Sequence, residues 1–212
     1  MAGCSCGTNV RFEGVSRRYR RVLLAVIAIN ACMFVVEMTA GALAGSQALK
    51  ADALDFLGDT LTYALSLWAI GRPLSVRAGA ALLKGASLGL MGLWVLGATL
   101  WQVFSTEVPV APVMGAVGAL AFAANIASVL LLLRYRDGDA NVRSVWLCSR
   151  NDAIGNLAVI AAAGAVVLTG AAWPDLLVAA AMAGLFLWSS AQIVTQALAE
   201  RGEARGEAQA PG

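Results

Sequence analysis

Six long apolar runs constrain this chain more than any other feature of its sequence. Short polar segments separate the runs, which span residues 22–43, 49–70, 78–101, 110–133, 145–168 and 174–198. An apolar helix of about 20 residues crosses the hydrocarbon core of a bilayer. Only helices and closed barrels satisfy all their backbone hydrogen bonds there. The runs therefore predict an all-α membrane protein with six transmembrane helices.

The composition supports this class and predicts a simple division of the chain. Hydrophobic residues make up 59% of it and charged residues 13%, which is typical of membrane proteins. The net charge of +2 gives nucleic acid binding no electrostatic support. We expect a cytoplasmic leader over 1–21, a transport domain over 22–198 and a short cytoplasmic tail over 199–212. The tail is polar and is expected to be disordered beyond a turn or two.

Basic residues predict the orientation of the helices. If the N-terminus lies inside, the inner segments hold nearly all of the arginines and the outer loops almost no basic residue except Lys50. This asymmetry follows the positive-inside rule. We therefore expect a multi-pass protein of the inner (plasma) membrane with both termini in the cytoplasm. The inner arginines are Arg17, Arg18, Arg20, Arg21, Arg72, Arg77, Arg134, Arg136, Arg143, Arg201 and Arg205.

Two pairs of metal-ligating side chains lie inside apolar runs. Asp55 and Asp59 are four residues apart in the second run, and Cys148 and Asp152 are four apart in the fifth. Residues at this spacing share one face of a helix. A charged residue at the bilayer centre costs at least about 2.5–3.5 kcal/mol, so it usually marks a functional site. Three carboxylates and a thiol from two helices predict a four-ligand site for a divalent metal.

Other polar residues in the apolar runs have weaker patterns. Asp52 lies on the same face as Asp55, and Asn156 continues the face of Asp152. We expect Glu37 to line a path to the site. Asn30 and Asn125 are either interhelical hydrogen-bonding residues or polar lining of that path. The residues expected to line a path or to support the ligands are thus Asp52, Glu37, Asn30, Asn125 and Asn156.

Three further features have structural as well as functional interpretations. Arg150 is rotated by about 200° from Cys148 on a helix, so it should point away from the site. The glycines of GALAG and GASLG favour close helix packing. Cys4 and Cys6 would make a weak capture site for a thiophilic metal, although an unstructured leader is the simpler interpretation.

The chain resembles the cation diffusion facilitator family, dimeric metal/proton antiporters related to bacterial cobalt-zinc-cadmium resistance proteins. The matching stretches are FVVEMTAGALAGSQALKADALDFLGD and NVRSVWLCSRNDAIGNLAVIAAAG, and the likeness extends over residues 17–198. The second helix of that family offers HxxxD or DxxxD and the fifth usually HxxxD. Asp55, Asp59 and Asp152 match these positions, whereas Cys148 takes the place of the usual histidine.

The resemblance implies a homodimer that exchanges a divalent cation for protons, with no cofactor and no enzymatic activity. Helices one, two, four and five would surround the site, with three and six packed alongside. The chain has no histidine at all, so the family's histidine-rich loop is absent. We also expect it to lack the family's C-terminal cytoplasmic domain. Oxygen and sulfur ligands suit zinc, cadmium or cobalt, zinc most of all.

Two other classes stay open at this point. A membrane-embedded metal-dependent enzyme such as a CDP-alcohol phosphotransferase also contains DxxxD, but the upstream DGxxAR of that family is absent before Asp55. A non-transporting membrane subunit that needs a partner is the other alternative.

Overall fold

Six α-helices make up the fold of the residues that the structure describes. The structure is a computed structural model that describes residues 16–69, 74–104, 107–135 and 140–209. Within these ranges it is helical, with no strand, which confirms the predicted fold class. The helices are α1 (Arg17–Ala44), α2 (Gln47–Ala69), α3 (Leu74–Val103), α4 (Ala111–Leu132), α5 (Ala140–Thr169) and α6 (Trp173–Gln209), with a 3₁₀ turn η2 (Leu133–Tyr135) after α4.

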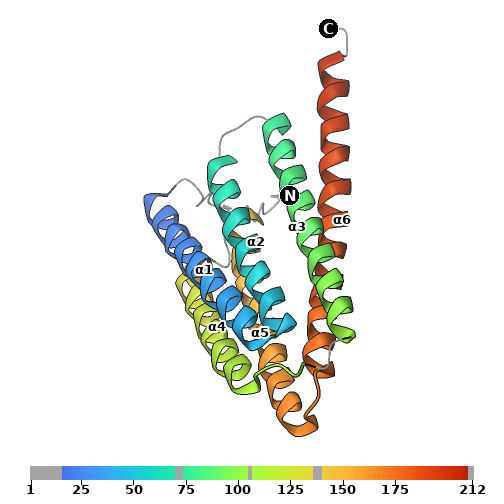
Figure 1. The fold of residues 1–212 in the computed structure, drawn as a ribbon. Coiled ribbons are helices and arrows are strands. Elements are labelled where there is room, and N and C mark those ends of the chain that lie inside the picture. Colours follow the sequence, from blue (N-terminus) through green and yellow to red (C-terminus); the bar gives the residue numbers. More distant parts are fainter. Residues whose placement is uncertain (1–15, 70–73, 105–106, 136–139, 210–212) are drawn as a thin grey trace, which may run out of the picture.

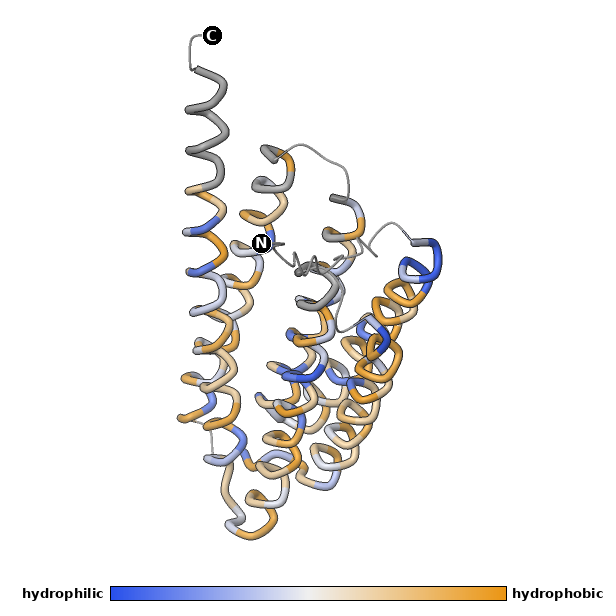
Figure 2. The backbone as a smooth tube through the Cα atoms, turned by 180° about the vertical axis from the view of Figure 1, so that it is seen from behind, coloured by the Kyte–Doolittle hydropathy of each residue, from blue (hydrophilic) through white to orange (hydrophobic). Residues whose placement is uncertain are grey.

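Five of these helices are long and apolar enough to cross a membrane, namely α1, α3, α4, α5 and α6. Figure 2 shows their predominantly apolar course, interrupted by a few hydrophilic stretches. The exception, α2, is 23 residues long and carries Lys50, Asp52, Asp55 and Asp59 within its first 13 residues. It packs against α1, α3, α5 and α6, so its charged residues lie among other helices. We treat it as the sixth transmembrane segment.

The helices form two groups that meet at α2. In Figure 1, α3 and α6 run side by side, and α1, α4 and α5 lie on the other side of α2. Gly85 and Gly89 allow the close approach of α3 and α6. A Cβ atom on Gly85 would lie 2.7 Å from Val194 Cγ2, and one on Gly89 would lie 2.7 Å from Ser190 Oγ. Ser190 Oγ also donates a 2.7 Å hydrogen bond to the Gly85 carbonyl. The predicted packing role of the GASLG glycines is confirmed.

A hydrogen-bonded cap closes the end of the bundle where the α1–α2 and α5–α6 turns lie, which we call the loop end. Asp175 of α6 is fully buried and accepts hydrogen bonds from three successive residues at the start of α2. Its donors are Ser46 Oγ at 2.6 Å, Gln47 N at 2.8 Å and Ala48 N at 3.1 Å. The first N–H groups of a helix lack partners within it. Asp175 therefore caps α2 from another helix.

Two neighbouring features complete the loop end. Gly45 ends α1 in the left-handed conformation, with φ of 70°, which glycine adopts without strain. Gln102 of α3 donates to the Gly45 carbonyl at 2.8 Å and accepts a hydrogen bond from the Gln47 side chain. The turn between α1 and α2 is thus fixed to both α3 and α6. Gly45 serves this turn, while Gly41 faces Lys50 and Leu49 closely enough for its predicted packing role.

The predicted helix ends were right to within a few residues except at three places. Helices α1 and α5 each begin five residues before their apolar runs, at Arg17 and Ala140, and α6 continues to Gln209. The tail was expected to be disordered beyond a turn or two, but the helix continues further, to Gln209. Residues 199–209 are rich in alanine, glutamate and arginine, which are strong helix formers, and they contain no proline. Cys4 and Cys6 lie outside the described residues.

Candidate functional site

A cavity of about 550 Å³ lies between α2, α3, α5 and α6. Its lining begins at Asp52, near the start of α2, and reaches Leu65 toward the far end of that helix. On α6 it extends from Met182 to Ile193. The residues of the loop-end cap are not among its lining residues. The cavity therefore occupies the middle of the bundle and the half that leads away from the loop end.

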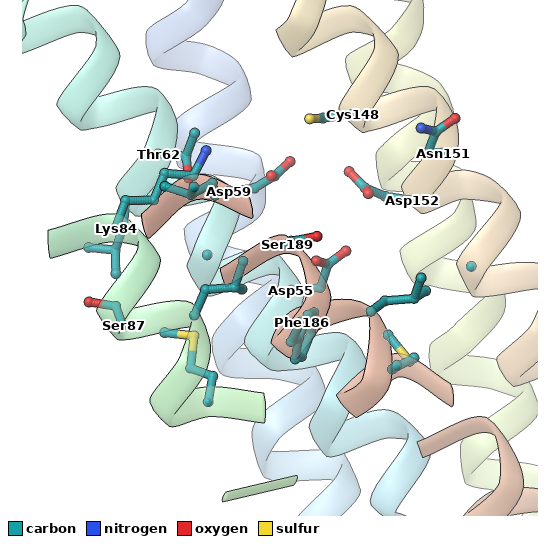
Figure 3. A pocket seen from close by; sticks show the side chains of 18 of the residues that line it. Asp55, Asp59, Thr62, Lys84, Ser87, Cys148, Asn151, Asp152, Phe186 and Ser189 are labelled. Carbon is teal, nitrogen blue, oxygen red and sulfur yellow. The ribbon is translucent and has the colours of Figure 1, made fainter. Parts of the chain in front are cut away.

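The four predicted ligands all line this cavity. Figure 3 shows Asp55 and Asp59 on α2 opposite Cys148 and Asp152 on α5, with their side chains directed into the same space. Asp152 lies close enough to interact with both Asp55 and Asp59. Within the described ranges, however, no three Asp, Glu, Cys or His side chains are gathered tightly enough to hold a metal ion. Side-chain rotation or helix movement would be needed for joint ligation.

The four-residue spacing explains why each pair faces the cavity. Residues four apart lie one above the other on a helix, so α2 and α5 each present two ligands on a single face. Tyr63 continues the α2 face by one more turn, and its hydroxyl donates a hydrogen bond to Asp59. This bond orients one carboxylate oxygen of Asp59 toward Tyr63.

A chain of buried polar side chains runs from this site across the other helices. Asn125 Nδ2 of α4 donates to Asn156 Oδ1 of α5 at 2.8 Å, and Asn156 Nδ2 donates to Asp52 Oδ2 of α2 at 2.6 Å. Glu37 of α1 lies beside Asp52. All four side chains are at most 2% exposed. Asn125 is therefore an interhelical hydrogen-bonding residue, one of the two roles expected for it.

The two predicted path residues of α1, Glu37 and Asn30, differ from the hydrogen-bonded side chains Asn125, Asn156 and Asp52. Both carboxylate oxygens of Glu37 and the Oδ1 atom of Asn30 are buried without a hydrogen-bond partner in the described part of the chain. Only Asp52 of the five predicted path residues lines the cavity itself. The other four residues, on α1, α4 and α5, lie outside the cavity lining.

Sequence reasoning missed several polar residues of the cavity. Lys84 and Ser87 of α3, Asn151 of α5, Thr62 of α2 and Ser189 of α6 all contribute to its lining. Lys84 carries the same signal as the aspartates, a charge inside an apolar run. The neutral residues carry no such signal, because serine and threonine are common in transmembrane helices as backbone-bonded residues. Asp175 was also missed, because an acid in the first turn of a helix suggests only an interaction with that helix itself.

Arg150 lies where its position on the helix predicted. It is exposed, its guanidinium lies 5.5 Å from the centroid of the Trp146 ring, and it donates to Asn151 Oδ1 at 3.3 Å. It does not line the cavity. Lys84 is therefore the one basic residue among the described residues that line the cavity.

The arrangement of helices around the cavity differs from the one that the resemblance implied. In the described residues, α1 and α4 contribute nothing to the lining, and α3 and α6 form the second wall. The cause is the tight α3–α6 packing, which makes these two helices a unit facing α2 and α5. Helices α3 and α6, which were expected only to pack alongside the four helices around the site, instead form part of the cavity wall.

Comparison with known families identifies the class of the protein. The family model of the cation efflux transmembrane domain matches residues 23–200, which is most of the chain. Among curated proteins, no significant match is found. The members of this family are transporters and not enzymes. Because the family match covers all six helices, the chain belongs to the cation diffusion facilitator family of multi-pass membrane proteins, which carry metal cations out of the cell.

Proposed function

We propose that the protein exports a divalent transition metal from the cytoplasm in exchange for protons, and that Asp55, Asp59, Cys148 and Asp152 bind the metal. The observation that carries this proposal is the convergence of three carboxyl groups and a thiol from two helices on one cavity. Each belongs to an apolar segment, where an ionisable group without a partner is costly. A divalent cation is a partner that all four side chains are able to share.

The ligand chemistry favours zinc, cadmium or cobalt, with zinc as the physiological ion. Carboxylate oxygen and thiolate sulfur together suit these borderline and soft ions, whereas manganese and magnesium prefer oxygen alone. Zinc also prefers four ligands in a tetrahedron, the number that α2 and α5 supply. A site of this kind requires that α2 and α5 approach each other or that the side chains rotate when the metal binds.

Competition for the same atoms would couple metal to protons. Carboxylates and thiols bind metal in their deprotonated forms, so each ion that binds displaces protons. On an acidic outer side the ligands would take up protons and release the metal, and in the cytoplasm the reverse would occur. The buried chain from Asp52 to Asn125, with Glu37 beside it, supports a polar route for protons apart from the metal.

The position of the cavity supports an inward-facing state. If both termini are cytoplasmic, the loop end faces outward and the Asp175 cap closes it. The cavity then lies between the membrane centre and the cytoplasm. We further propose a homodimer in the inner membrane, as the resemblance to the family implies.

Metal flux into proteoliposomes tests the transport proposal. Sealed vesicles contain the purified chain, a fluorescent indicator for zinc or cadmium, and no nucleotide. We expect that an imposed pH gradient drives metal uptake and that metal entry moves protons in the opposite direction. Uptake that ignores the pH gradient, without proton counter-flow, would show that antiport is wrong.

Substitutions at the deepest ligands test the site. Asp59→Ala and Asp152→Ala are each expected to abolish uptake while the protein still inserts and elutes as a folded species. Ser87→Ala is the matched control, because Ser87 lines the same cavity on the opposite wall and is not a proposed ligand. Wild-type flux in either aspartate variant would remove that residue from the site.

A further inference from the structure

Lys84 is a charged residue that the transport chemistry described above does not use. It lies on α3 within the apolar span Gly79–Val103. A lysine in a transmembrane segment faces either the membrane surface, by extending its stem, or a polar interior. A hydrophobic side chain would pack at this position at no electrostatic cost.

The structure places the Lys84 side chain on the cavity side of α3. It is part of the lining together with Ser87 and Leu88 of the same helix. In Figure 3 the Lys84 amine extends from α3 toward Thr62 and Asp59 on α2. Its charge interacts with two of the proposed ligands, Asp59 and Cys148.

The charges in the cavity show what such a lysine would do. With all four proposed ligands deprotonated, Asp55, Asp59, Cys148 and Asp152 bring four negative charges, and Asp52 also lines the cavity. A divalent cation balances two of these charges, and the Lys84 ammonium supplies one further positive charge. Because Arg150 lies outside the cavity, Lys84 is the only described lining residue that supplies this charge. A positive charge fixed by a covalent tether also repels a second cation that enters the same space.

We propose that Lys84 is a built-in counter-cation of the metal site, which lowers the affinity for divalent metal and thereby speeds its release. This inference rests on the proposed function. Lysine suits the role because its ammonium is a compact charge on a flexible four-carbon stem. The ammonium approaches the carboxylates when the metal leaves and withdraws when the metal enters. A transporter needs such weakening, since an ion that binds too tightly in an acidic cavity is released slowly.

The test is equilibrium binding of zinc alone to the purified protein in lipid nanodiscs, measured by competition with a chelating fluorescent indicator. Lys84→Met keeps the length of the side chain and removes its charge, so we expect it to bind zinc at least about tenfold more tightly, or about 1.4 kcal/mol. Lys84→Arg keeps the charge and should bind like the wild type. In proteoliposomes, Lys84→Met should show a turnover lowered by about the same factor.

Moving the positive charge from Lys84 to a neighbouring position distinguishes an electrostatic role of Lys84 from a packing role. Ser87 lies about one turn from Lys84 on the same wall, so the double variant Lys84→Met with Ser87→Lys should return zinc affinity toward the wild-type value. A residue that acts only through packing would not be rescued in this way. If wild-type protein binds zinc and Lys84→Met binds it equally or more weakly, the role of Lys84 is refuted and the metal site stands. If wild-type protein binds no zinc, the proposed function itself fails.

Discussion

Removal of the Asp175 carboxylate should destabilise the whole loop end of the bundle. Asp175 accepts three hydrogen bonds from Ser46, Gln47 and Ala48, all of which are buried. Asp175→Ala leaves these donors without a partner in a region that water reaches poorly. A hydrogen bond to a charged group contributes about 1.5–3 kcal/mol. Loss of an N-cap costs about 0.5–2 kcal/mol.

These contributions overlap, because the three donors share one carboxylate and Ser46 Oγ also accepts from Leu49 N at 3.1 Å. We therefore expect Asp175→Ala to lower the free energy of unfolding by about 2–4 kcal/mol. For a chain of this length that corresponds to a decrease of about 5–15 °C in Tm. The assay is thermal unfolding in detergent, followed by intrinsic tryptophan fluorescence and by loss of the monodisperse elution peak.

Two control variants test the geometry of the cap. Asp175→Asn keeps one oxygen acceptor but replaces the other with an amide NH2 donor, which cannot accept a hydrogen bond, so its effect should be smaller than that of Asp175→Ala. Ser46→Ala removes a single donor and should fall between the wild type and Asp175→Ala. A Tm for Asp175→Ala within about 2 °C of wild type would refute the reasoning, as would equal effects of alanine and asparagine.

Two further predictions concern the thiol ligand and the α3–α6 contact. Cys148→Ser should weaken cadmium binding more than cobalt binding, because a hard oxygen replaces a soft sulfur; equal losses for the two ions, measured by indicator competition, would count against ligation by Cys148. Gly85→Val should destabilise the protein by about 1–3 kcal/mol in the same unfolding assay, since the new Cβ would lie 2.7 Å from Val194 Cγ2. Gly97→Val is the control, because no atom lies within 4 Å of a Cβ there, and a similar loss in both variants would refute the packing argument.

The helices and the shared faces of the four proposed ligands were predictable because both depend on local pattern. Apolar runs determine which segments enter the membrane, and the four-residue spacing fixes the shared face of Asp55 and Asp59 whatever the neighbouring helices are. The contribution of α3 to the cavity was not predictable in this way. Whether Lys84 turns toward the cavity or the membrane surface depends on how α3 packs against α6, which no local spacing encodes.

The same distinction explains the Asp175 cap and the length of α6. From sequence alone, an acid in the first turn of α6 is expected to stabilise the N-terminus of α6. The structure shows that Asp175 instead accepts a hydrogen bond from Ser46, which precedes α2. The extension to Gln209 follows intrinsic helix propensity, which outweighed the expectation of disorder drawn from polarity. Local sequence patterns predicted the helices and their polar faces, while contacts between helices determined which side chains lie together.

The close contact between α3 and α6 has a mechanical consequence. Because Gly85, Gly89 and Ser190 hold the two helices together along one side, the pair would move as a single rigid body against the rest of the protein. The cavity is then a joint between two stiff parts, which stay connected toward the loop end by the Asp175 cap and by the buried contacts of Ala51 and Leu54 with α3 and α6. Its width would therefore change by a hinge-like movement about that end. Lys84 and Ser189 travel with one part, and all four proposed ligands travel with the other. Any displacement of the joint therefore changes the distance between the tethered ammonium and the acids in a single movement.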